Sequence, residues 1–311
     1  MEGLLSMVEE YGWKGRIVPI RHLADLREAI LKRYSEGLID KEFYRNQLGF
    51  LNFDLPSSLP NAVSVLIVAV PTPQMRIVFN WEGRSVPVII PPTYVSYTRR
   101  TTSVQKTLAE RIAKEGYHLV NAQLPLKTLA VCSGLAKYGR NNICYVNTMG
   151  SFLQLVGAFT DVPCKDDPWH EPQAMSRCQS CVACLHICPT KAISHERFLI
   201  HAEKCLTYHN EAPGDLPEWI NPSWHHCLFG CMRCQTICPE NKSKLDWIED
   251  RAEFSETETT FLLRNLPFSD LPVEAASRIE SLQINEKFQP LCRNLAMVLK
   301  NRYPPDSQLS Q

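Results

Sequence analysis

Nine of the thirteen cysteines in this 311-residue chain lie between positions 178 and 238. Seven of them stand two or three residues apart in two short runs, whereas the cysteines of a disulfide framework are scattered more widely. Proteins of the reducing cytosol rarely hold disulfides, so cysteines gathered in this way indicate metal ligands. The segment therefore predicts a metal-binding domain.

The spacing within the two runs identifies the kind of metal centre. The runs are Cys178-Gln-Ser-Cys181-Val-Ala-Cys184-Leu-His-Ile-Cys188-Pro189 and Cys231-Met-Arg-Cys234-Gln-Thr-Ile-Cys238-Pro239. The first has the C-x2-C-x2-C-x3-C-P spacing in which three thiolates hold one [4Fe–4S] cluster and the fourth reaches a second cluster. The second run repeats the latter half of that pattern. We expect two [4Fe–4S] clusters, because a zinc site would leave both Cys-Pro ends unexplained.

The second run lacks its first cysteine, since Leu228 stands three residues before Cys231. Either Cys205 or Cys227 could complete the set, and we favour Cys205 because a C-x3-C start is unusual for such a loop. Crossed ligation then assigns Cys178, Cys181, Cys184 and Cys238 to cluster one, and Cys188, Cys205, Cys231 and Cys234 to cluster two. The isolated cysteines, Cys132, Cys144, Cys164 and Cys292, are expected to be buried small hydrophobic residues.

The chain before the cysteines alternates between strand and helix patterns. Residues 62–70 form an apolar, β-branched run typical of a strand buried on both faces, and residues 75–81 and 86–90 resemble a hairpin. A helix over 104–116 follows, and shorter strands and helices continue to residue 159. We expect an α+β protein of four parts. These are an N-terminal helical cap (1–55), an α/β core (56–165), a ferredoxin-like double-cluster domain (166–245) and a C-terminal helical segment (246–311).

Charge and hydropathy give little information about partners. The chain has 33 Lys and Arg and 33 Asp and Glu, so its net charge offers no argument for a nucleic-acid or membrane partner. The first residues lack the basic and apolar regions of a signal peptide, and no apolar stretch is long enough to span a bilayer. We expect a cytoplasmic protein without a membrane partner, and nucleic-acid binding stays open.

Three further elements make the resemblance to a known family specific. They are Ser133-Gly-Leu-Ala-Lys-Tyr-Gly-Arg-Asn141, Gly150-Ser151-Phe152 and Thr160-Asp161-Val-Pro163. Together with the cysteine arrangement, they resemble the A-G-L-G-x-x-G-(K/R)-N, G-S and T-D-L-P elements of epoxyqueuosine reductases and of their relatives, the reductive dehalogenases. The resemblance covers most of the chain after about residue 50.

The resemblance implies a nitroreductase-like α/β core that holds cobalamin, with the two clusters passing electrons to its cobalt. The implied donor is a ferredoxin or a flavodoxin, and the implied substrate is a small molecule or a modified base. The cofactor-binding residues implied by the shared elements are Gly134, Lys137, Gly139, Arg140, Asn141, Gly150 and Ser151.

One departure from the family affects the expected proton donor. Epoxyqueuosine reductases carry an Asp in a V-D-S-A-P element, and the corresponding region here, residues 119–125, has Asn121 and Gln123 but no acid. Neutral amides form hydrogen bonds but supply no proton at pH 7. We expect a tyrosine or water to take this role, and the resemblance places Tyr97 and Tyr138, as well as Tyr94, near the cofactor.

Three alternatives remain open at this point. The chain could be an electron-transfer protein that reduces a separate corrinoid protein and has no substrate of its own. It could be a tRNA epoxyqueuosine reductase whose acid has moved. A third alternative is a protein that holds a flavin where its relatives hold a corrinoid.

Overall fold

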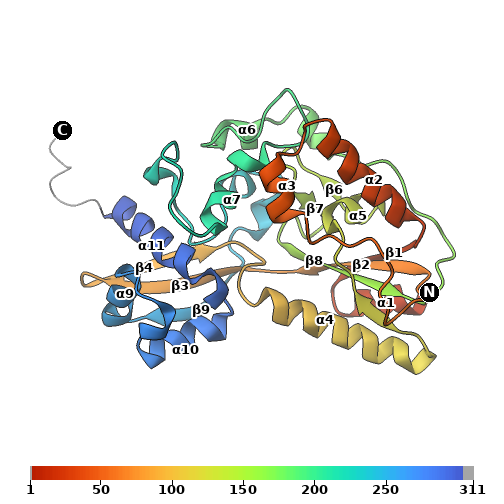
Figure 1. The fold of residues 1–311 in the computed structure, drawn as a ribbon, viewed down its shortest axis with the longest axis horizontal. Helices are drawn as coiled ribbons and strands as arrows, with labels where there is room; N and C mark the ends of the chain where they lie inside the picture. Colours follow the sequence, from red (N-terminus) through yellow and green to blue (C-terminus); the bar gives the residue numbers. More distant parts are fainter. Residues whose placement is uncertain (1, 304–311) are drawn as a thin grey trace.

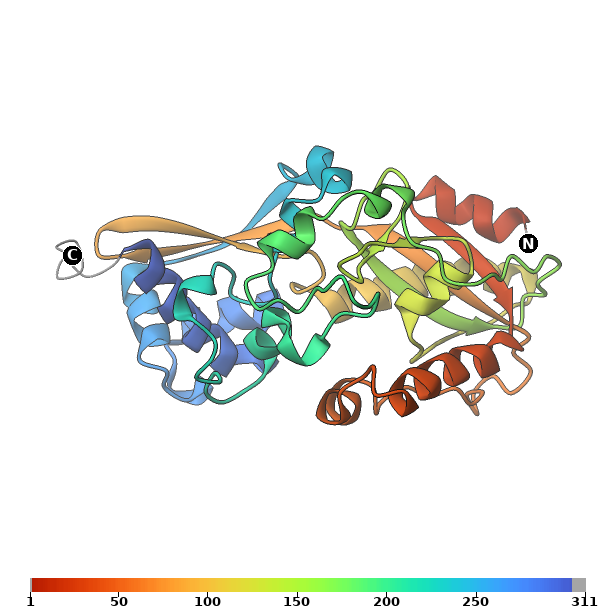
Figure 2. The same cartoon turned by 90° about the horizontal axis from the view of Figure 1, so that it is seen from above.

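The computed structural model describes residues 2–303. Two units with sheets stand at the ends of an elongated molecule, and the cysteine-rich segment lies between them (Figures 1 and 2). The mixture of helices and strands confirms the expected fold class. Within the described residues, no helix is both long and apolar enough to cross a membrane.

The first unit is built on a four-stranded antiparallel sheet. Its strands, in spatial order, are β1 (Lys14–Pro19), β2 (Ser64–Pro71), β8 (Leu153–Thr160) and β5 (Leu119–Asn121). Successive side chains of β2 point to opposite faces, so Val65 and Ile67 join the core under α2 (His22–Ser35) and α5 (Leu126–Cys132). Leu66 and Val68 join the core under α1 (Glu2–Glu10) and α4 (Tyr97–Ile112). The prediction that this strand is buried on both faces is confirmed.

The N-terminal segment, residues 1–55, was expected to be helical, but it also contains a strand. Besides α1, α2 and α3 (Lys41–Gln47), it contains β1, which pairs antiparallel with β2 over its whole length. The adjacent β-branched residues Ile17 and Val18 are buried on the two faces of the sheet. A six-residue strand between helices was missed because its partner, β2, lies about fifty residues further along the chain.

The second unit combines a long hairpin with C-terminal helices. β3 (Gln74–Trp81) and β4 (Arg84–Ile90) pair antiparallel, which confirms the predicted hairpin. β9 (Ile248–Phe254) adds in parallel on the other side of β3, although residues 246–311 were expected to be helical throughout. β9 was missed because only Ile248, Ala252 and Phe254 are apolar in it. Beyond it follow α9 (Glu256–Leu263), α10 (Val273–Leu282) and α11 (Phe288–Arg302).

The segment between the two units is rich in loops. Its regular elements are the short α6 (Ala183–Ile187), α7 (Leu206–Glu211) and α8 (Arg233–Thr236), with several single 3-10 turns. The strands β6 (Lys137–Tyr138) and β7 (Cys144–Tyr145) form a small hairpin, and Tyr138 makes an isolated bridge to Ala174 at the start of the segment. This hairpin therefore connects the first unit to the cysteine-rich segment.

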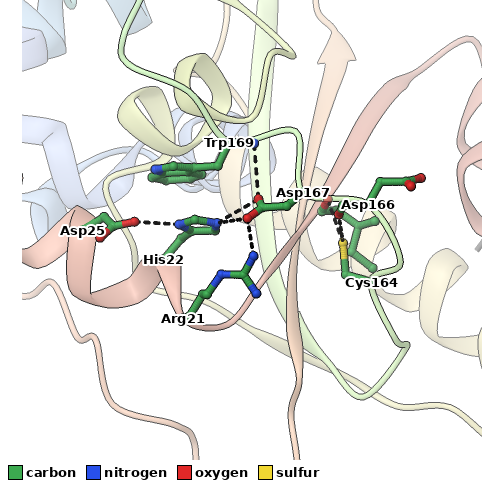
Figure 3. Close-up of polar contacts among 8 residues, drawn as sticks. Arg21, His22, Asp25, Cys164, Asp166, Asp167 and Trp169 are labelled. Atoms are coloured by element: carbon green, nitrogen blue, oxygen red, sulfur yellow. Dashed lines mark hydrogen bonds and ion pairs between the residues drawn. The ribbon is translucent and has the colours of Figure 1, made fainter.

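A polar cluster ties the start of α2 to the chain that leads into the cysteines (Figure 3). Both ring nitrogens of His22 face carboxylates, with Nδ1 2.6 Å from Asp25 and Nε2 2.8 Å from Asp167. The ring also stacks on Trp169, and Asp167 accepts a further hydrogen bond from Arg21. These contacts join residues about 145 positions apart and hold α2 against the chain that leads into the cysteines.

Candidate functional site

The structure brings together the four cysteines expected to hold cluster one. Cys178, Cys181, Cys184 and Cys238 line one small cavity. Arg140, from the turn between β6 and β7, holds the loop around it, because its guanidinium donates to the carbonyl oxygens of Cys178 and Cys181. The backbone N–H of Arg140 also points at Sγ of Cys178, 3.4 Å away. A cluster in this cavity would thus receive a hydrogen bond from the first unit.

The four cysteines expected to hold cluster two also meet. Cys188, Cys205, Cys231 and Cys234 line a second cavity of about 370 Å³. Cys227 does not line it and instead packs with Phe152 and Met232 in a separate apolar cluster. The geometry supports Cys205 over Cys227 as the fourth ligand. Cys205 lies outside both cysteine runs, so the spacing of neighbouring cysteines alone does not identify it.

Four cysteines line each cavity, which matches the number of ligands that a [4Fe–4S] cluster takes. Within residues 2–303, no three side chains of Cys, His, Asp or Glu converge closely enough to ligate one metal ion. A cubane offers a separate iron to each thiolate, so its ligands stand further apart. Burial, together with neighbouring thiols, raises the pKa of Cys184 to about 11 and that of Cys231 to about 12. Without a cluster these thiols stay protonated at neutral pH. A bound cluster would deprotonate them, because metal coordination favours the thiolate.

The remaining isolated cysteines mostly behave as expected. Cys132, Cys144 and Cys292 are buried. Cys164 is only partly buried, and its thiol donates to the carbonyl oxygen of Asp166 in the loop shown in Figure 3. A loop position next to exposed charged residues explains the difference for Cys164.

Four of the seven residues implied as cofactor-binding line the cysteine cavities. Gly139, Arg140 and Asn141 line the cluster-one cavity, and Asn141 and Ser151 line the cluster-two cavity. The other three, Gly134, Lys137 and Gly150, line none of the cavities described here. The backbone at Gly134 and Gly150 has a positive φ, which favours glycine at both positions.

Gly150 and Ser151 form a joint between the first unit and the cluster segment. The N–H of Ser151 donates to Oδ1 of Asn241, and the Asn241 amide donates back to Oγ of Ser151 and to the carbonyl oxygen of Gln235. A Cβ on Gly150 would stand 2.9 Å from the carbonyl oxygen of Glu240 and still closer to Oδ1 of Asn241. The joint therefore requires glycine at position 150.

A much larger cavity of about 910 Å³ adjoins the cluster-two cavity. Its walls come from α2, α3, the start of α4, the loop after β5, and the segment around α7. Cys205 and Thr207 line both cavities, as do Lys127 and Asn142. A cluster held by Cys205 would therefore sit at the wall of the large cavity.

The tyrosines named from the sequence occupy different positions. Tyr97 and Tyr138 line the large cavity, and burial raises the pKa of both. The hydroxyl of Tyr138 lies 3.1 Å from Oγ1 of Thr128, whereas Tyr97 is 45% exposed. Tyr94 lies at the cluster-two cavity instead, and its hydroxyl donates to Glu211. The neutral Asn121 and Gln123 also line the large cavity.

Sequence reasoning missed two carboxylates at this cavity. Among the described residues that line it, Glu203 and Glu211 are the acids. Both oxygens of Glu211 are engaged, one by Tyr94 and the other by Lys287 at 2.7 Å. Within residues 2–303, the carboxylate of Glu203 has one hydrogen-bond partner, the ring of His201 at 3.2 Å. In the sequence, Glu203 and Glu211 stand on either side of Cys205. This nearness could have indicated acids close to cluster two, but it gained meaning only because the structure places Cys205 at the wall of the large cavity.

Two adjacent cavities, each lined by four cysteines, define a double-cluster iron–sulfur protein. Residues 177–241 match the family described as "4Fe-4S double cluster binding domain". The expectation of two [4Fe–4S] clusters is therefore supported by both the arrangement of the cysteines and this family match.

Curated relatives point to one kind of enzyme. The chain is 33% identical over 149 residues to epoxyqueuosine reductase of Burkholderia pseudomallei, covering 44% of this chain and 36% of that one. The Escherichia coli enzyme is 36% identical over 127 residues, covering 40% and 32%. The chain thus spans about a third of the length of these relatives. Epoxyqueuosine reductase of Atelocyanobacterium thalassa matches over 77% of this chain and 81% of its own length, at 27% identity.

Solved structures agree with these relatives in fold. Epoxyqueuosine reductase of Streptococcus thermophilus superposes with a TM-score of 0.69 at 19% identity, over 97% of this chain and 82% of that one. An epoxyqueuosine reductase bound to an epoxyqueuosine-modified tRNA stem loop gives 0.70 at 19% identity, over 96% and 80%. The resemblance to epoxyqueuosine reductases that the sequence predicted is confirmed in fold over nearly the whole chain and in sequence over part of it.

Proposed function

We propose that this chain is an iron–sulfur reductase in which cluster one and cluster two conduct single electrons to a cobalamin in the large cavity. The substrate would be a small molecule or a modified base, reduced inside the same cavity. The observation that carries the proposal is the shared wall, because Cys205 lines both the cluster-two cavity and the large cavity. An electron path from a cluster needs an acceptor within reach, and this cavity offers the space for one.

The residues of the large cavity suit a corrinoid. Its wall is largely apolar, and side-chain amides and hydroxyls interrupt it at Gln105, Asn121, Asn142 and Thr101. A corrin ring presents apolar faces and a periphery of amides, so these side chains match it in chemistry. A bound corrinoid would supply a cobalt centre able to take the single electrons that clusters deliver.

The chain's own side chains would then control protons and position. Tyr97 and Tyr138 are protonated at neutral pH, because the ordinary pKa of a tyrosine hydroxyl already lies well above 7 and burial raises it further in both. Each can therefore donate a proton to a substrate in the cavity. Gln105 donates to Oδ1 of Asn121 at 2.6 Å, which fixes the amide at the position of the missing acid.

Anaerobic reconstitution with iron, sulfide and cobalamin tests the proposal. We expect the protein to retain cobalamin after gel filtration, seen as a corrin spectrum beside about eight irons per chain. Leu155→Trp, which projects into the large cavity, should lower cobalamin retention at unchanged iron content. Leu31→Trp is the matched control, because Leu31 is exposed on the outer side of α2 and does not line that cavity. A folded, iron-replete protein without corrin would overturn the proposal and favour an electron-transfer role.

A second candidate, a tRNA epoxyqueuosine reductase with a relocated acid, is favoured by one observation. Glu203 lines the large cavity and has no cation pairing with it apart from the His201 ring, within residues 2–303. A solved relative with this fold holds an epoxyqueuosine-modified tRNA stem loop. Reduction of epoxyqueuosine tRNA by the wild-type chain, lost in Glu203→Gln and kept in Glu211→Gln, would establish this candidate. Without any reduction of that tRNA, a different substrate is required.

A further inference from the structure

We propose that Arg233 sets the reduction potential of cluster two, by placing a buried N–H and a positive charge against that cluster and not against cluster one. The inference rests on the proposed ligation of cluster two and concerns the iron–sulfur part of the molecule alone. Arg233 stands between Cys231 and Cys234 in the sequence and lines the same cavity as all four proposed ligands.

The guanidinium of Arg233 has an N–H group without a hydrogen-bond acceptor in the part of the chain that the structure describes. Its Nε is buried and has no hydrogen-bond partner within residues 2–303, and one of its terminal nitrogens lies 3.5 Å from the carbonyl oxygen of Trp224. No carboxylate pairs with it among the residues that the structure describes. A buried donor without a partner destabilises the folded state, so such groups usually indicate a missing acceptor. The sulfide and thiolate sulfurs of a cluster would be that acceptor.

The arginine at the other cluster is used differently. The guanidinium of Arg140 is committed to the backbone carbonyls of Cys178 and Cys181, and only its backbone N–H faces a thiol. Arg177, directly before Cys178, is 59% exposed and paired with Glu240. The two arginines that line the cluster-one cavity, Arg140 and Arg177, are thus both committed to other partners, unlike Arg233.

This difference gives the two clusters a direction. Reduction adds one electron to a cluster, and a nearby positive charge or N–H donor stabilises the added negative charge. Cluster two, beside Arg233, would have the higher potential of the pair. One electron would then pass from reduced cluster one to oxidised cluster two. This transfer, which leads toward the large cavity, would be favourable in free energy because cluster two has the higher reduction potential.

A redox titration of the reconstituted two-cluster protein, followed by electron paramagnetic resonance with dithionite as reductant, tests the inference without any substrate or corrinoid. In Arg233→Gln we expect one of the two midpoints to fall by at least the 59 mV that corresponds to a tenfold change in a one-electron equilibrium. Arg233→Lys should restore part of the shift, since it keeps the charge but loses the Nε donor.

Arg177→Gln is the matched control, because it removes the same charge next to a proposed ligand but at an exposed and paired position. We expect its midpoints to stay near those of the wild type. Unchanged midpoints in an Arg233→Gln protein with about eight irons would overturn the inference and leave the proposed function intact. Equal shifts in Arg233→Gln and Arg177→Gln would also overturn it, because a general surface charge would then explain the effect.

Discussion

The cluster segment, residues 166–245, and the second unit, formed by β3, β4 and residues 248–303, are stabilised in different ways. The second unit has a continuous apolar core in which Phe79 and Phe254 stack and α11 contributes Leu291 and Leu295. Within the described residues, the cluster segment adds Leu228 and Phe229 to that core, and its own buried groups are two small ones that both contain cysteines. The comparison indicates that one region folds by burying apolar side chains, whereas the other depends on its clusters.

Removal of iron should have the largest effect on this comparison. We expect anaerobic chelation to raise amide hydrogen exchange of residues 176–240 by about 100-fold or more, equal to about 3 kcal/mol of local stability. α9, α10 and α11 should keep their protection, because their core contains no proposed ligand. Equal loss of protection in both regions, measured by mass spectrometry, would contradict the difference.

Single cysteine substitutions separate ligands from packing residues. Cys205→Ser should lower the iron content from about eight to about four per chain, because it removes one proposed ligand of cluster two. Cys227→Ala should keep about eight irons, since Cys227 packs only with apolar side chains such as Phe152 and Met232. Loss of iron in Cys227→Ala together with full iron content in Cys205→Ser would identify Cys227 as the ligand and Cys205 as the packing residue.

The joint between the first unit and the cluster segment can be broken without touching a cysteine. Gly150→Ala should destabilise the folded protein by about 2–3 kcal/mol, because the new Cβ meets Asn241 and Glu240 in a backbone conformation that disfavours alanine. Gly37→Ala has a similar positive φ but no atom near the new Cβ, so it should cost about 1 kcal/mol. Thermal unfolding of the reconstituted proteins measures both, and equal costs would show that the joint is loose.

The smallest expected effect lies in the second unit and depends on pH. Burial alone would raise the pKa of Glu258, but hydrogen bonds from Ser255 and Arg278 lower it overall. A lowered carboxyl pKa stabilises the folded state above the ordinary value of 4.5, and this contribution is lost as the pH falls through the lowered value. Glu258→Gln should weaken α9 by about 0.5–1 kcal/mol near neutral pH.

Hydrogen exchange of the α9 amides measures this effect, and the difference from the wild type should shrink as the pH falls below 4.5. The glutamine can still close the capping box with Ser255, so only the charged part of the interaction is removed. A difference that grows in acid would contradict the assigned direction of the pKa.

Local patterns were enough to predict several parts of the molecule. The two cysteine runs predicted a double-cluster segment because ligand spacing is a property of neighbouring residues. The strand at residues 62–70 and the hairpin around Gly83 were predicted for the same reason, since apolar period and turn chemistry act over a few residues. β1 and β9 escaped prediction because each becomes a strand by pairing with a distant partner.

The sequence by itself predicted two sets of cluster ligands, and the family resemblance predicted that Asn121 and Gln123 lie where the relatives carry an acid. Only the tertiary structure showed that Cys205, and not Cys227, lines one cavity with Cys188, Cys231 and Cys234, and that Glu203 and Glu211 line the large cavity. It also decided that Arg233 has an unpaired buried Nε. The physical reason is that burial, cavity walls and hydrogen-bond partners depend on residues brought together from distant parts of the chain.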